Sequence, residues 1–246
     1  MARLSKRLHI GTSGWSYGHW KGPFYPEHLP NERMLEYYAE HFHCAEINNS
    51  FYHLPERHIL EHWRDTVPKD FLFAAKASRY ITHMKKLKDA HRTLPPFLDR
   101  MQILADKLGP ILFQLPPRWS VNLERLNDFL DQLTDEFRYT MEFRDPSWFC
   151  PEVYDALAMH KVAFCIYDLD RTISPKEATA DFVYVRLHGP DGPYQGRYTR
   201  RTLAGWAGAF NTWIGGHKHV YCFFDNDDSG YAAINAAELQ DMLTKG

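Results

Sequence analysis

Short apolar, β-branched or aromatic runs recur along the chain, and most of the stretches between them have the spacing of amphipathic helices. One such helical face is formed by Leu123, Leu126, Leu130 and Leu133. Eight runs have the length and composition of strands: residues 8–12, 43–49, 71–76, 110–115, 139–144, 162–168, 182–188 and 219–225. Strands that alternate with helices predict parallel βαβ units, and eight units in this length favour a single α/β domain over 1–246, a (β/α)8 TIM-type barrel. An open doubly wound sheet is the alternative, because residues 169–180 carry little helical signal.

Polar side chains share one face of the predicted strands. In the run 182–188, Tyr184, Arg186 and His188 alternate with apolar residues, so we expect them to point into the barrel. Because active sites of such barrels form at the carboxyl ends of the strands, this face predicts a site there. The same face or the strand end holds Glu46, Asn48, Lys76, Gln114, Glu142, Arg144, Asp168, Asp225 and Asn226.

Charge and composition narrow the choice of partner and compartment. Lys and Arg number 29 against 31 Asp and Glu, a formal net charge of −2. A strongly cationic chain typical of nucleic-acid binders is therefore absent, although a local basic patch is compatible with this balance. The amino-terminal residues lead into no apolar segment of signal-peptide or membrane-span length, so we expect a cytoplasmic protein without a membrane partner.

The sequence predicts no metal and no cofactor. Residues 58–62 spell H-x-x-E-H, but they fall on a predicted outer helix, far from the expected site. Residues 225–230 resemble half of a calcium loop that lacks its closing glutamate. Lys76, Arg144 and Arg186 would repel a divalent ion, and no P-loop or G-x-G-x-x-G sequence is present.

Two loops that follow predicted strands have ligand-binding character. Residues 189–198 are rich in glycine and adjoin several arginines, which suits a phosphate or carboxylate group. Residues 15–26 contain five aromatic side chains. Aromatic residues after strand ends could wall a cleft for a ring-bearing ligand, or they could seal the barrel. The candidate wall residues are Trp15, Tyr52, Trp148 and Tyr198.

Several motifs occur in an order that resembles the YecE-like family, a family built on domain of unknown function 72. They are GTSGWSY at 11–17, EIN at 46–48, SFY at 50–52, FAAK at 73–76, FQLPP at 113–117, EFR at 142–144, VRLHG at 185–189 and FDN at 224–226. The resemblance spans nearly the whole chain and implies a TIM-type barrel, but it implies no reaction. Asp145 and His53 stand where the resemblance leads us to expect basic residues.

The leading hypothesis is an enzyme of the hydrolase or isomerase type that acts on a small, partly anionic ligand. Glu142 is the candidate base, Glu46 the candidate acid, and His188 a proton shuttle. The anionic group would be held by Arg144, Arg186 and the loop 189–198. Two alternatives stay open: a nucleic-acid-binding or nucleic-acid-processing barrel, and a non-catalytic ligand-binding protein. The oligomeric state does not follow from the sequence.

Overall fold

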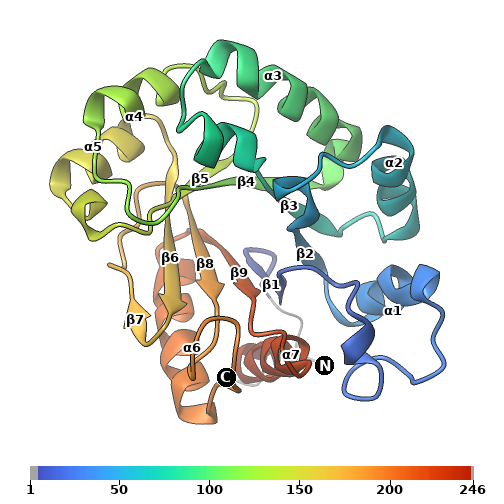
Figure 1. Cartoon of the computed structure of the whole chain (residues 1–246). Helices are drawn as coiled ribbons and strands as arrows, with labels where there is room; N and C mark the ends of the chain where they lie inside the picture. The colour runs from blue at the N-terminus through green and yellow to red at the C-terminus, as the bar shows by residue number, and fades with distance from the viewer. Residues whose placement is uncertain (1–4, 245–246) are drawn as a thin grey trace. The chain divides into compact units, whose positions relative to one another are not determined.

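A computed structural model describes residues 5–244. Within this range eight parallel strands alternate with helices (Figure 1). The strands are β1 (Leu8–Thr12), β2 (Cys44–Ile47), β3 (Leu72–Lys76), β4 (Leu108–Gln114), β5 (Tyr139–Glu142), β6 (Ala163–Leu169), β8 (Phe182–Leu187) and β9 (His219–Phe224). The helices are α1 (Met34–His41), α2 (Arg57–Thr66), α3 (Ala90–Met101), α4 (Leu123–Leu130), α5 (Pro151–Met159), α6 (Arg200–Gly215) and α7 (Tyr231–Thr244).

This succession confirms the predicted fold class, a (β/α)8 TIM-type barrel. The interval 169–180, where the helical signal is weak, holds no helix but a two-residue strand, β7 (Thr172–Ile173), which turns back antiparallel to β6. Strand β4 begins two residues earlier than predicted and includes Pro110. The register between β3 and β4 shifts between Phe73 and Ala75 of β3. This irregularity lets β4 include Pro110, which has no backbone N–H to donate.

The chain forms two compact units, each assembled from separate stretches of sequence. Unit 1 comprises residues 1–46, 166–174 and 181–246, and unit 2 comprises residues 47–165 and 175–180. Strand β6 contributes residues to both. Each unit is described by itself below, and the single domain over 1–246 stays a prediction.

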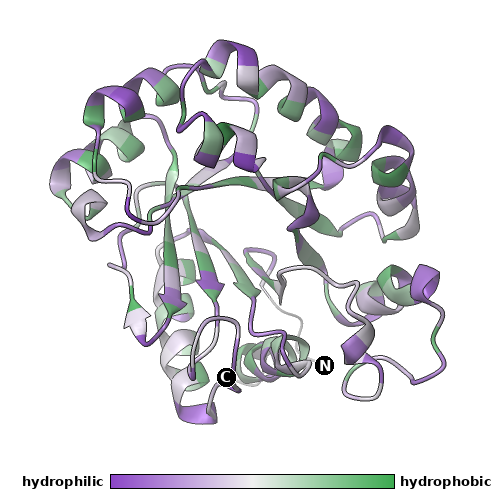
Figure 2. Cartoon of the chain, in the orientation of Figure 1, coloured by the Kyte–Doolittle hydropathy of each residue, from purple (hydrophilic) through white to green (hydrophobic). Residues whose placement is uncertain are grey.

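Unit 1 is a parallel sheet with its polar groups near the strand ends. β9 pairs with both β1 and β8, and Ser13 and Glu46 form a parallel bridge between the ends of β1 and β2. Helix α7 packs on β1 and β9, and α6 packs on β9 and α7. The strands are mainly hydrophobic, with hydrophilic segments near the arrowheads of β6 and β8 (Figure 2). Because β8 is buried along its whole length, its polar residues must find partners inside the protein.

Unit 2 contains the sheet β3-β4-β5 and the first part of β6. Gln114 at the end of β4 lies in register with Glu142 at the end of β5, so both polar side chains belong to the same edge. The core beneath this edge is aromatic, with Phe113 packed edge-on against Phe129 of α4. A π-helical turn, η4 (Tyr80–Met84), follows β3.

Candidate functional site

Unit 1 gathers a buried cluster of charged and polar side chains around one arginine. Arg186 is only 1% exposed, and it comes from β8, between β9 and β6 in the strand order. Its Nε lies 3.1 and 3.0 Å from the two carboxylate oxygens of Glu46, and its Nη2 donates to Glu46 Oε1 at 2.7 Å. Nη2 also donates to Asp225 Oδ2 at 2.9 Å and to Ser13 Oγ at 3.0 Å. The guanidinium therefore joins the ends of β1, β2, β8 and β9.

Glu46 is fully buried and accepts hydrogen bonds on both oxygens. Tyr184, two residues before Arg186 on the same strand face, donates to Oε2 at 2.6 Å, and Ser13 Oγ donates to Oε1. With the guanidinium added, both oxygens of this carboxylate accept from several donors. The predicted role of Glu46 as an acid stays a prediction, but its geometry is that of an anchor for Arg186.

His188 is fixed at both ring nitrogens. Its Nδ1 lies 3.0 Å from Asp225 Oδ2, and its Nε2 lies 3.3 Å from Arg186 Nη1. A guanidinium can only donate, so Nε2 accepts and the imidazole carries its proton on Nδ1. The ring of Tyr194 meets the imidazole edge-on, with centroids 5.6 Å apart. His188 is therefore buried beneath the loop 189–198 and helps to hold Asp225.

The more accessible side of this cluster carries carboxyl groups with raised pKa values. Burial, and then the negative charge of Asp225, raise the pKa of Asp227 from 3.8 to about 6. Burial also raises the pKa of Asp168, and a hydrogen bond from Tyr198 opposes this rise. The pKa of Tyr17 is raised by burial and by the charges of Asp225 and Asp227. Unit 1 thus holds one carboxyl group, that of Asp227, whose pKa of about 6 lets it hold a proton near neutral pH, and a second, that of Asp168, whose pKa is raised.

The glycine-rich loop 189–198 folds onto itself. The backbone N–H of Gly189 donates to the Tyr198 hydroxyl at 3.0 Å, and that of Tyr198 donates to Asn235 Oδ1 at 3.0 Å. Gly189 has φ +116°, and a Cβ there would lie 2.2 Å from the carbonyl oxygen of Gln195, so only glycine fits. These N–H groups are used within the protein, and the predicted phosphate cradle stays a prediction.

In unit 2, Glu142 at the end of β5 forms a buried ion pair with Arg144, which lies two residues beyond the strand. The Sγ of Cys165 lies 3.7 Å from the other carboxylate oxygen of Glu142. Lys76 lies over the ring of Phe51, with 4.5 Å from Nζ to the centroid. The expected juxtaposition of Glu142 with Arg144 is therefore present, while the pairing of Glu142 with Glu46 stays a prediction.

The predicted aromatic wall residues differ in exposure. Tyr52 is 64% exposed, whereas Trp148 is buried against Phe143, and its Nε1 donates to the carbonyl oxygen of Trp119 at 2.6 Å. Trp15 and Tyr198 are also buried, and a contact with a ligand stays a prediction for each of them. Among the amides, Gln114 and Asn48 are half-buried, and Asn226 is buried with Nδ2 2.8 Å from the carbonyl oxygen of Gly196.

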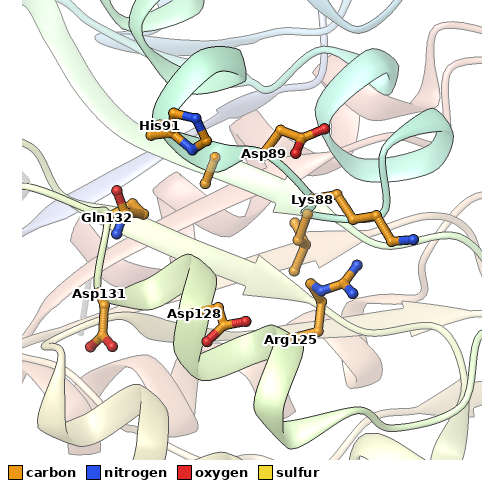
Figure 3. A pocket seen from close by; sticks show the side chains of 9 residues that line it. Lys88, Asp89, His91, Arg125, Asp128, Asp131 and Gln132 are labelled. Carbon is orange, nitrogen blue, oxygen red and sulfur yellow. The ribbon is translucent and has the colours of Figure 1, made fainter.

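A surface pocket of about 530 Å³ lies in unit 2, away from the residues that the sequence predicts (Figure 3). Its wall combines Lys88 and Arg125 with Asp89, Asp128 and Asp131. Lys88 and Arg125 lie on one side, and His91 and Gln132 lie on another (Figure 3). Because both basic and acidic groups line the pocket, its wall favours neither sign of charge.

Among residues 5–244, no group of three or more His, Cys, Asp or Glu side chains is arranged to hold a metal ion. His58 and His62 of the H-x-x-E-H sequence are exposed on α2. In the same part of the chain, no helix has the length and apolar character needed to cross a membrane. The expected absence of a metal and a cofactor stays a prediction.

Four members of the unit 1 cluster were not predicted as site residues. Tyr184 and Ser13 stand on or directly after predicted strands, and their polar groups on a buried face were the available signal. Asp227 lies two residues after the predicted Asp225, and Tyr17 lies in the aromatic loop. The raised pKa values of Asp227 and Tyr17 depend on burial and on charged neighbours in the folded protein. Neither can be seen in the sequence.

Comparison with known proteins places these observations in a family. The family model described as "Protein of unknown function DUF72" matches residues 9–246. UPF0759 protein YecE of Escherichia coli (strain K12) is 34% identical over 143 residues, which cover 58% of this chain and only 50% of YecE. UPF0759 protein YunF of Bacillus subtilis (strain 168) is 27% identical over 275 aligned residues, covering 96% of this chain and 94% of YunF. The crystal structure of a DUF72 family protein from Thermotoga maritima MSB8 superposes with a TM-score of 0.87 at 28% identity, covering 96% of this chain and 98% of that one.

Proposed function

Since the chain belongs to the DUF72 family, whose description carries no activity, we propose its function from the chemistry of its own residues. It is an enzyme of the hydrolase or isomerase type that uses carboxyl groups of unit 1 for acid and base catalysis. The single observation that supports this proposal most is the fixed array of Glu46, Arg186, His188 and Asp225 at the carboxyl ends of the strands.

Burial separates the groups that position from those that can reach a substrate. Glu46, Arg186 and His188 are at most 1% exposed, and their polar atoms contact one another or Asp225. Asp227 is half-buried and lies close enough to Asp225 for its charge to matter. Asp225 is also buried, at 6% exposed, so we assign proton transfer to Asp227 from its exposure and to Asp225 from its place beside Asp227, and we treat the other three as positioning residues.

The two aspartates suit complementary roles. Arg186 donates to Asp225, which favours the carboxylate and a function as base, whereas a group with a pKa of about 6 can donate a proton near neutral pH. In hydrolysis, Asp225 takes a proton from water while Asp227 gives one to the leaving group. In isomerisation, Asp225 removes a proton from carbon while Asp227 protonates the neighbouring carbonyl oxygen, which gives an enediol. Asp225 then returns its proton to the adjacent carbon while Asp227 takes the proton of the other hydroxyl, which becomes the new carbonyl.

In unit 1, Arg186 does not offer its hydrogen-bond donors to an anionic group of a ligand. Arg186 directs its donors to two carboxylates of the protein, so we propose that this cluster acts on an uncharged part of the substrate.

A substrate screen followed by one matched pair of variants tests this function. The probes are p-nitrophenyl glycosides, esters and phosphates for hydrolysis, and aldose and ketose phosphates for isomerisation. Once turnover is found, Asp227→Asn should lower kcat at least about 100-fold. It should also remove the fall in rate that wild type shows as pH rises through about 6. Asp228→Asn, an exposed neighbour, should behave like wild type.

Two results would contradict the proposal. Saturable binding of a probe without turnover would favour the non-catalytic binding protein instead. Equal turnover by Asp227→Asn and Asp228→Asn would remove the acid assignment.

A further inference from the structure

Unit 2 carries a surface in which aromatic rings and cations alternate. We call it the aromatic–cation surface and define it by Phe51, Tyr52, Lys76, Tyr80, Lys85, Lys86 and Trp119. Three cation–π pairs occur within it: Lys76 over Phe51 at 4.5 Å, Lys85 over Tyr80 at 5.8 Å, and Lys86 over Trp119 at 5.8 Å. These residues come from the segments that follow β2, β3 and β4, so the fold brings together parts of the chain that are distant in sequence.

The charge of this surface is strongly one-sided. Its defining residues include three lysines and no acidic residue, and residues 76–86 hold four Lys and Arg and no Asp or Glu in a chain whose formal net charge is −2. Asp89 is paired with Lys85, with 3.0 Å between Nζ and Oδ2, and Glu142 is paired with Arg144. Burial, and then the charges of Lys76, Arg79 and Arg144, lower the pKa of His83 to about 4. His83 is therefore neutral at neutral pH, and the neighbouring cations add to the effect of burial.

Several apolar groups on this surface face solvent. Tyr52 is 64% exposed, Tyr80 46% and Met84 66%. The π-helical turn η4 that carries Tyr80 is followed by Lys86, Leu87 and Asp89 in the left-handed region, with φ of 46°, 65° and 55°. Such backbone is costly for residues other than glycine and is concentrated at functional sites. The turn thus holds exposed rings beside lysines at a conformational cost.

We propose that the aromatic–cation surface binds the base and phosphate of a nucleotide unit, either free or within a single strand of nucleic acid. Exposed rings stack on the flat faces of bases, and lysines beside them neutralise the adjoining phosphates. Neither feature alone specifies this ligand, because a basic patch suits any anion and exposed rings suit any flat apolar group. The mixed-charge pocket of Figure 3 is not part of the surface, since its wall combines basic and acidic groups and holds no aromatic ring of the Phe, Tyr or Trp type. The inference does not rest on the proposed catalysis in unit 1.

The experiment uses the full chain and a fluorescein-labelled 12-residue oligo(dT). Binding is followed by anisotropy at 50 and 200 mM salt, and AMP and inorganic phosphate serve as competitors. Lys86→Asn removes a charge and keeps a residue that tolerates left-handed backbone. Its matched control is Lys161→Asn, an exposed lysine of unit 2 with φ 55° that pairs with Asp135 away from this surface. Tyr52→Ala removes a stacking ring, and Met159→Ala is the control for loss of an exposed apolar side chain.

Wild type should bind the oligonucleotide, and affinity should fall as salt is raised. Tyr52→Ala should weaken binding about tenfold or more, as expected for loss of one stacked base. Lys86→Asn should weaken it and flatten the salt dependence, and both controls should match wild type. Tighter binding with oligonucleotide length would identify a strand as the ligand, whereas full competition by AMP at similar concentration would identify a free nucleotide.

Absence of oligonucleotide and AMP binding at 50 mM salt would overturn the inference. So would equal affinity of the surface variants and their controls, or competition by inorganic phosphate as strong as that by AMP. NMR gives an independent readout, because bound phosphate should raise the pKa of His83 above about 4. None of these outcomes depends on catalytic turnover, so the inference and the proposed function can fail separately.

Discussion

Arg186 donates hydrogen bonds to Glu46 and Asp225, and its removal would leave both carboxyl groups without this cation. Arg186→Met would leave Glu46 without its cation in a fully buried position and would remove a donor from Asp225. Breaking a buried ion pair by removing one partner costs roughly 3–5 kcal/mol. We expect the urea unfolding midpoint to fall accordingly. Arg197→Met is the control, because that arginine pairs with Glu238 while half-exposed and should cost far less. Equal losses in the two variants would contradict the central role of Arg186.

Asp227 gives a pH dependence whose sign follows from its raised pKa. Its pKa is 3.8 in an ordinary setting and about 6 in the folded protein, so between these values the folded state binds more protons than the unfolded state. Stability contributed by this group is therefore present below about pH 4 and is lost as pH rises through 6. Asp227→Asn should be more stable than wild type at pH 7, by about 1 kcal/mol after allowance for solvent screening, and similar to it at pH 4.

Thermal unfolding from pH 4 to pH 8 checks this expectation, with Asp228→Asn as the exposed control. A carbon-13 titration of the Asp227 carboxyl group should show a midpoint near 6. A midpoint near 4, or equal stability curves for the two variants, would show that Asp227 is hydrated like an ordinary surface acid.

The turn after β8 requires glycine for a steric reason, which gives a prediction at the scale of an element. Gly189→Ala would place a methyl group 2.2 Å from the Gln195 carbonyl oxygen at φ +116°, so the loop must move away from Tyr198 and His188. We expect a lower melting temperature and a changed environment of Tyr194 in near-ultraviolet circular dichroism. Gly205→Ala on α6 meets nothing within 4 Å and should be stabilising by about 0.5–1 kcal/mol. If both changes raise the melting temperature, the turn is not constrained as described.

The strands and helices can be predicted from the periodicity of the sequence. Prediction of the contacts in the site also requires the order and register of the strands. Alternation in 182–188 places Tyr184, Arg186 and His188 on one face, and the structure shows all three in contact with the cluster of unit 1. Alternation cannot say that Arg186 would direct its donors to Glu46 and Asp225, because that depends on which strands become neighbours. It likewise cannot foresee β7, since two exposed residues carry no hydrophobic pattern.

Strand β6 contributes residues to both units, and this bears on how the chain unfolds. Its first residues pair with β5 in unit 2, where Ala163 lies in register with Thr140. Its end belongs to unit 1, where the carbonyl oxygen of Asp168 accepts the backbone N–H of His188 at 2.9 Å. Each unit also consists of separate stretches of sequence, so neither is a continuous piece that could be cut out. We therefore expect the chain to unfold in one cooperative transition.

Hydrogen exchange with mass spectrometry at increasing urea concentration measures this directly, because peptides from the two units are read in one experiment. In wild type, peptides from β4 in unit 2 and from β9 in unit 1 should lose protection at the same urea concentration. Arg186→Met changes a residue of unit 1 alone. It should nevertheless lower the urea midpoint of the β4 peptides as much as that of the β9 peptides. The reason is that β6 contributes residues to both units and cannot be folded in one unit while it is unfolded in the other. A shift confined to the β9 peptides would show that the two units unfold independently, and the single domain predicted from the sequence would then be wrong.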